Sequence, residues 1–135
     1  MEETGHQAKK RVDLSDEEIE EKVLRIKQTI QQGRFGCDYT LTHGIKMKRL
    51  KENYFIEDSR ILEILKDLDL INFIKAEYSD NEKFPDDIMY IFKKHVSLMP
   101  KLIENAEMQI VCIYIKITWT QPSEIMLVMS FHEDE

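Results

Sequence analysis

The sequence predicts an α+β fold in which N-terminal helices pack on one face of an antiparallel sheet that ends in a C-terminal β-hairpin. The first half of the chain carries apolar residues at helical spacings of three and four. From Gln109 to His132, β-branched and aromatic residues instead alternate with polar ones, as in half-buried strands. Helices that precede strands, rather than alternating with them, indicate α+β architecture.

The length of 135 residues and the apolar content are those of one domain, which we expect to span residues 14–132. Residues 1–13 lack periodicity and are predicted to be a disordered tail, and residues 133–135 to be an acidic tail. The chain has no apolar run of membrane-spanning length and no signal peptide, so we expect a cytoplasmic protein without a membrane partner. Cys37 and Cys112 are too isolated to predict a disulfide or a zinc site.

The formal net charge of −7, from 19 basic and 26 acidic residues, disfavours a general nucleic-acid binder, because such proteins are usually basic. The acidic residues are concentrated towards the two ends, and the middle of the chain is near balance. A local basic patch is therefore compatible with the composition.

The first helix is the best defined element. Ser15 followed by Glu18 forms a capping box, and acidic residues suit the positive end of a helix dipole. Gly33 is expected to end the helix. Its apolar stripe is formed by Ile19, Val23, Ile26 and Ile30.

Residues 34–37 are short enough to be a connecting strand, and Asp38 or Thr40 is then expected to cap a second helix that runs to about Lys51. This helix is the most basic stretch of the chain. Its cationic and histidine residues are His43, Lys46, Lys48, Arg49 and Lys51. They form either an exposed charged face or a surface that attracts RNA phosphates.

A third helix is expected after Asp58 or Ser59, with an apolar face made of Ile61, Leu62, Leu65 and Leu68. Strands are predicted at residues 72–78 and 88–93, separated by turn-forming residues. Pro100 interrupts residues 94–108, for which we expect a loop with one helical turn.

The closing hairpin can be divided by parity, because successive side chains of a strand point to opposite faces. In the first strand the alternate residues from Val111 to Trp119 form an apolar face, and Tyr114 and Lys116 belong to the other face. In the second strand the apolar face is predicted to contain Ile125, Leu127, Met129 and Phe131.

A turn at Pro122–Ser123 would set the register of this hairpin. It would pair Trp119 with Ile125, Ile113 with Phe131, Tyr114 with Ser130, and Cys112 with His132. Tyr114 and His132 would then be diagonal neighbours on the polar face, within reach of each other.

Several segments resemble the MqsR (motility quorum-sensing regulator) family of bacterial toxins in the RelE-like superfamily. They are residues 23–33, 68–75, 78–80, 113–118 and 127–131. The resemblance implies a RelE-like toxin fold and a metal-independent endoribonuclease that needs no cofactor and cleaves messenger RNA. It also implies a type II toxin–antitoxin pair, in which a small helix-turn-helix or zinc-containing antitoxin silences the toxin.

The resemblance also implies catalytic residues. The strand lysine of the family corresponds to Lys75, its sheet tyrosine to Tyr114, and its C-terminal lysine to His132. The histidine is a departure from the family pattern. So is the region of Pro85 and Asp86, where the family has a glutamine and this chain has none.

In the implied reaction, the ribose 2′-hydroxyl attacks the adjacent phosphorus while a base and an acid move protons and cations stabilise the phosphorane. His132 suits proton transfer near neutrality. Tyr114 is expected to take part if flanking lysines lower its pKa. Lys75 and Lys116 are expected to supply positive charge.

We expect RNA contacts from Lys116 and, in the basic stretch, from Arg49, Lys48 and His43. Two other interpretations are open. One is a non-catalytic RelE-like domain that binds a protein, which the net acidity favours. The other is a metal-dependent enzyme using His43 or His95, although neither histidine has acidic neighbours at ligand spacing.

Overall fold

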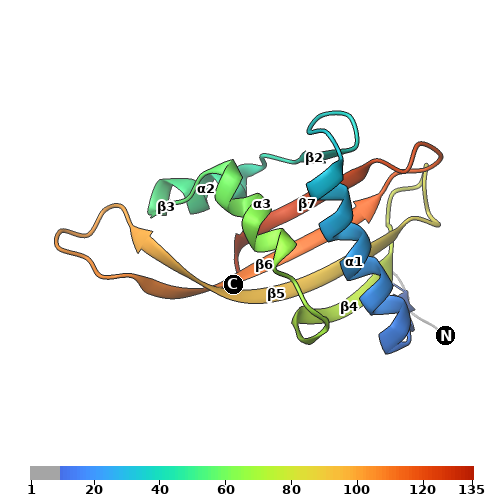
Figure 1. Cartoon of the computed structure of the whole chain (residues 1–135), viewed down its shortest axis with the longest axis horizontal. Helices are drawn as coiled ribbons and strands as arrows, with labels where there is room; N and C mark the ends of the chain where they lie inside the picture. The colour runs from blue at the N-terminus through green and yellow to red at the C-terminus, as the bar shows by residue number, and fades with distance from the viewer. Residues whose placement is uncertain (1–9) are drawn as a thin grey trace.

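The computed structural model describes residues 10–135 and shows an α+β fold, with three α-helices and a mostly antiparallel seven-stranded sheet in this part of the chain (Figure 1). The helices are α1 (Asp16–Gln32), α2 (Ile45–Asn53) and α3 (Asp58–Lys66), and a 3₁₀ turn follows at Leu70–Asn72. The strands are β1 (Arg11–Val12), β2 (Tyr39–Leu41), β3 (Tyr54–Phe55), β4 (Phe73–Tyr78), β5 (Ile88–Pro100), β6 (Gln109–Trp119) and β7 (Met126–Glu133).

The sheet has the order β1-β4-β5-β6-β7-β2, with β3 paired to β5 away from this path. β2 runs parallel to β7, and the remaining pairs are antiparallel. The two long strands β5 and β6 lie side by side in the centre, and their far ends extend as an arm beyond the helices (Figure 1).

The prediction for α1 is confirmed. The Ser15 side chain accepts a hydrogen bond from the Glu18 backbone N–H at 3.2 Å, and the Glu18 carboxylate accepts one from the Ser15 N–H at 3.0 Å. At the other end the N–H of Gly33 donates to the Thr29 carbonyl at 2.8 Å. A Cβ on Gly33 would lie 2.4 Å from that same oxygen, so a residue without a side chain is required there.

α1 and α3 lie across one face of the sheet and enclose the core against it (Figure 1). Every second residue of the central strands points into this core, as strand geometry requires. The fully buried sheet side chains are Phe92, Ile113, Ile115, Ile117, Met126, Val128 and Phe131.

The opposite face of the sheet carries most of the polar side chains. One row runs from Lys93 through Tyr114 to His132, and the next contains Lys116 and Ser130 beside the buried Ile91. The sheet therefore separates an apolar, helix-covered face from a polar face, which for brevity we call the open face.

The second helix begins later than expected. Residues 39–41 form β2 rather than helix, and α2 begins at Ile45, after Gly44, which offers no side-chain cap. These residues form a strand because they pair with β7 in parallel, and this pairing buries the side chains of Tyr39 and Leu41. In place of the connecting strand predicted over residues 34–37, the structure has a single bridge from Phe35 to Tyr39.

The predictions for the segment after residue 93 and for the start of α3 also differ from the structure. β5 continues to Pro100, so residues 94–100 are strand and residues 101–108 alone form the connection to β6. Pro100 is tolerated because it is the last residue of the strand. α3 follows Glu57, which makes no side-chain cap, and Asp58 is its first helical residue.

The predicted register between the last two strands is wrong. Trp119 pairs with Met126 rather than Ile125, since the connection spans Thr120 to Ile125 and closes with a 2.9 Å hydrogen bond between those two residues. Met129 is then an extra residue between the pairs Ile117–Val128 and Lys116–Ser130. This β-bulge moves the later residues to the other face.

The bulge explains which side chains are buried in β7. Met126 and Val128 point into the core before the bulge and Phe131 points into it afterwards, whereas Leu127 is only partly buried. Strict alternation predicted Ile125, Leu127 and Met129 for the core instead. Strict alternation fails here because one residue interrupts the period of two.

Parts of both predicted tails belong to strands in the structure. Residues 1–9 of the predicted tail lie outside the described residues, but Arg11–Val12 form β1 and pair with β4. Glu133 of the predicted acidic tail is the last residue of β7. Within residues 10–135, no helix is long and apolar enough to cross a membrane. Cys37 and Cys112 are both reduced.

Candidate functional site

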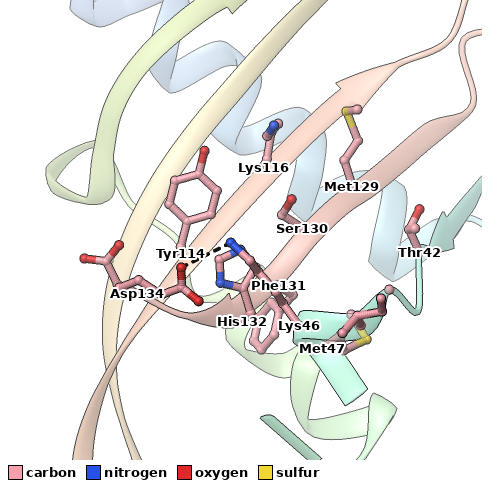
Figure 2. A pocket seen from close by; sticks show the side chains of 13 residues that line it. Thr42, Lys46, Met47, Tyr114, Lys116, Met129, Ser130, Phe131, His132 and Asp134 are labelled. Atoms are coloured by element: carbon pink, nitrogen blue, oxygen red, sulfur yellow. Dashed lines mark hydrogen bonds and ion pairs between the residues drawn. The ribbon is translucent and has the colours of Figure 1, made fainter. Parts of the chain in front are cut away.

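A groove of about 530 Å³ lies at the border between the open face and the start of α2 (Figure 2). Tyr114, Lys116, Ser130 and His132 line it from β6 and β7, while Lys46 and Met47 line it from α2. Its remaining lining residues are Thr42, Gly44, Ile45, Met129, Phe131, Asp134 and Glu135.

Tyr114 and His132 form the centre of this site. They are direct partners across β6 and β7, and their rings stack with centroids 5.1 Å apart and planes 20° from parallel. Nδ1 of His132 lies 2.9 Å from the Glu133 carbonyl oxygen, so Nδ1–H donates to it. In the neutral imidazole this bond leaves the lone pair on Nε2, which can then accept a proton.

The pKa of Tyr114 is raised, not lowered as the flanking lysines suggested. Partial burial is the largest cause, and the negative charges of Glu77 and Asp134 add to it, while Lys93 acts in the opposite direction. Burial disfavours the phenolate because it removes solvent from the charge. Tyr114 is therefore a protonated phenol at neutral pH and a proton donor.

Two of the lysines on the open face have carboxylate partners. Lys93 stands opposite Tyr114 and lies 3.0 Å from the carboxylate of Asp134, whose hydrogen bond raises the pKa of the Lys93 ammonium group. Lys75 lies 3.1 Å from Glu77 on β4. Lys116, one row away from Tyr114, lines the groove beside Ser130.

The basic residues of α2 lie around the groove to different degrees. Lys46 lines it and forms a 3.2 Å ion pair with Glu135, drawn as the dashed line in Figure 2. Arg49 lines a smaller adjoining hollow together with His132. Lys48 is exposed and lines neither of these two hollows.

His43 is engaged elsewhere. Its Nε2 lies 3.1 Å from a carboxylate oxygen of Asp58, which also binds the ammonium group of Lys51. Burial opposes ionisation of Asp58, but hydrogen bonds from Lys51 and His43 outweigh it and lower the pKa of this carboxyl group. This cluster links the loop before α2 to the start of α3, which is a structural role.

Across residues 10–135, no group of three or more His, Cys, Asp or Glu side chains is arranged to hold a metal ion. His95 lies on β5 opposite Cys112, away from His43.

The structure thus brings Tyr114, His132 and Lys116 together, with Arg49 beside them. Lys75, His43 and Lys48 do not line the groove. Sequence reasoning missed Lys93 and Lys46 as members of this site. Lys93 belonged to a predicted strand, but nothing in the sequence fixes which residue of β6 it faces. Lys46 belongs to the basic stretch described above. Its direction towards the groove depends on α2 beginning at Ile45, which the sequence does not predict.

No family model, curated protein or solved structure matches this chain. The function of the site must therefore be inferred from the chemistry of its residues. An imidazole that can accept a proton, a phenol that can donate one, and the ammonium groups of Lys46 and Lys116 share one groove. Such a set can transfer protons and stabilise negative charge on a phosphate ester.

Proposed function

We propose that this protein is a metal-independent endoribonuclease, the toxin of a type II toxin–antitoxin pair, which cleaves messenger RNA by attack of the ribose 2′-hydroxyl. The observation that carries this proposal is the stacked Tyr114–His132 pair in a groove bordered by lysines. The resemblance of several segments to MqsR toxins adds to it. A RelE-like toxin fold closed by a C-terminal β-hairpin belongs to the same proposal.

The roles follow from the hydrogen bond made by His132 and from the raised pKa of Tyr114. Nε2 of His132 accepts the 2′-hydroxyl proton as the 2′-oxygen bonds to phosphorus, and Tyr114 donates its phenolic proton to the departing 5′-oxygen. The products are a 2′,3′-cyclic phosphate and a 5′-hydroxyl. Lys116 stabilises the charge that develops on the phosphoryl oxygens, and Lys75 adds to the positive field.

Arg49 is placed to contact the RNA backbone beside His132. The side chains of Lys48 and His43 do not line the groove, so we expect them to contribute to RNA attraction only at its periphery. The natural partner would be a cognate antitoxin in the cytoplasm, either a helix-turn-helix or a zinc-containing protein.

The test is cleavage of a labelled single-stranded RNA by the purified protein in the presence of a metal chelator. His132→Gln and Tyr114→Phe should each slow cleavage by about 10²- to 10⁴-fold, because each removes a proton-transfer group. An oligonucleotide without 2′-hydroxyl groups should not be cut, and the product should carry a 2′,3′-cyclic phosphate.

The matched controls are His95→Gln and Tyr78→Phe, which change the same residue types outside the groove. They should cleave at nearly the parent rate. Equal cleavage by the parent, His132→Gln and Tyr114→Phe would show that this pair is not catalytic.

A second candidate function is a non-catalytic domain that binds another protein. The arm formed by the far ends of β5 and β6 carries exposed apolar side chains, among them Leu102 at 83 % exposure and Ile110 at 69 %. Such a patch often marks an interaction surface. This alternative predicts that no variant cleaves RNA, and that Leu102→Asp with Ile110→Asp abolishes binding to the product of the neighbouring gene.

A further inference from the structure

The groove is occupied at two of its borders by carboxylates from the chain itself. Asp134 pairs with Lys93 at 3.0 Å and Glu135 pairs with Lys46 at 3.2 Å. Both acidic residues directly follow β7, the strand that carries His132. The carboxylates that follow His132 therefore occupy positions beside the two lysines that the phosphates of an RNA substrate would take.

The two lysines border the Tyr114–His132 pair on opposite sides. Lys93 is the partner of Tyr114 on β5, and Lys46 projects from α2, which packs against β7. The order across the molecule is thus Lys93, Tyr114, His132 and Lys46. Neighbouring strands lie about 4.8 Å apart, so roughly 10 Å separates the backbones of Lys93 and His132.

We propose that Lys93 and Lys46 are the contacts for the RNA phosphates on either side of the scissile bond, and that Asp134 and Glu135 cover them until RNA displaces the carboxylates. This inference rests on the proposed function. It assigns two substrate-binding residues and a competing anionic segment to the same groove.

The strength of the two ion pairs suits such a displacement. The side chains of Lys93 and Asp134 are 38 % and 26 % exposed, and those of Lys46 and Glu135 are 52 % and 62 % exposed. Exposed ion pairs contribute little net free energy, so they can be exchanged for a phosphate contact at small cost.

The fold allows the carboxylates to be neutralised without disturbing the strands. Asp134 is fixed by its backbone N–H, which donates to the Cys112 carbonyl at 2.8 Å. Asparagine retains that hydrogen bond. Glu135 makes its contact to Lys46 through the side chain, which glutamine copies in shape.

The experiment measures binding of a single-stranded oligonucleotide that is 2′-O-methylated at every ribose and so cannot be cleaved. The double variant Asp134→Asn with Glu135→Gln should bind it about three- to ten-fold more tightly than the parent at low salt. The matched control is Glu104→Gln with Glu107→Gln, which makes the same change in net charge in the exposed turn of the arm. It should change binding less than about two-fold, because those residues are distant from the groove.

The lysines are tested in the neutralised background. Adding Lys46→Met or Lys93→Met to Asp134→Asn with Glu135→Gln should reverse the gain in affinity. Each should also reduce the dependence of log affinity on log salt by about 0.7, the value for one phosphate contact to a single strand. Lys83→Met, on the turn between β4 and β5, should leave that slope unchanged.

The outcomes separate this inference from the proposed function. If the parent cleaves RNA but the neutralised variant binds no more tightly than the Glu104/Glu107 control, the covering role is wrong and the ribonuclease proposal stands. If the neutralised variant binds more tightly but no protein cleaves unmodified RNA, the phosphate contacts stand and the catalytic proposal fails. Absence of binding by every variant would overturn both.

Discussion

Tyr114 and His132 complement each other as a proton donor and a proton acceptor. Burial raises the pKa of Tyr114, so its phenol keeps the proton at neutral pH. In neutral His132 the bond from Nδ1–H to the Glu133 carbonyl leaves the lone pair on Nε2, which can accept a proton.

A residue-scale prediction concerns Asp58, whose folded-state pKa is held below its usual value by Lys51 and His43 against the effect of burial. A lowered carboxyl pKa adds stability above the unfolded-state value of about 3.9, and that stability is lost as the pH falls through the folded-state pKa. Asp58→Asn should therefore lower the free energy of unfolding by about 0.5–1 kcal/mol near neutral pH, the range for exposed pairs. At about pH 2 the two proteins should unfold alike in urea.

Asp86→Asn is the control for this measurement, since Asp86 is exposed and lies in the turn before β5. Its stability should equal that of the parent across the acid range. A difference between Asp58→Asn and the parent that persists at about pH 2 would mean that the Asp58 side chain acts through packing rather than charge.

At the residue scale, the sequence predicts which face of a strand a residue occupies better than which residue lies opposite it on the neighbouring strand. Parity placed Tyr114 and Lys116 on one face, and that holds in the structure. The lysine that faces Tyr114 is Lys93, and this depends on the pairing of β5 with β6, which no local pattern encodes. Flanking lysines do not lower the pKa of Tyr114 below its usual value, because burial and Glu77 raise it, and both depend on residues distant in the sequence.

At the scale of elements, local sequence signals predict an element correctly where its backbone hydrogen bonds are made within the element itself. α1 has a capping box at one end and Gly33 at the other, and its predicted limits are confirmed. β2 had no such signal. Its three residues were assigned to helix because strand formation there depends on β7, which lies more than eighty residues later in the sequence.

The burial pattern of β7 gives an element-scale prediction. Val128 is fully buried, whereas Leu127 is partly exposed on the open face. Val128→Ala should cost about 2 kcal/mol of unfolding free energy, because it leaves a cavity, and Leu127→Ala about 1 kcal/mol or less. Chemical denaturation of the two variants measures the difference.

Strict alternation from Ile125 predicts the reverse order of these two effects. A larger loss for Leu127→Ala than for Val128→Ala would therefore place the β-bulge elsewhere than at Met129. Neither variant changes a residue of the Tyr114–His132 pair.

At the scale of the whole molecule, stability is concentrated where β5 and β6 are paired on both sides. Ile91, Phe92, Ile113 and Ile115 are at most 1 % exposed and sit in the middle of the sheet. The fold class follows from the order of elements alone, but the seven-stranded sheet does not, since β1, β2 and β3 are two or three residues long. Such short strands exist only through pairing with longer ones.

Hydrogen exchange measured by NMR tests this distribution. The amides of Ile91, Phe92, Ile113 and Ile115 should exchange most slowly, at the rate set by global unfolding. Residues 101–108 should exchange fastest among the described loops of the sheet, because they connect β5 and β6 without strand pairing. Protection of residues 101–108 comparable to that of Ile115 would show that the arm is covered in solution.

The β-bulge at Met129 has a consequence for how this site can vary between genes. Because the bulge is one added residue, deleting Met129 would leave Val128 paired with Ile117 and Ser130 with Lys116, so that Phe131 and His132 would keep their faces in a regular ladder. Replacing Met129 by another amino acid would keep the count and hence the arrangement. The site should thus tolerate both a deletion and a substitution at Met129, because the faces of Phe131 and His132 are set by their pairing with β6.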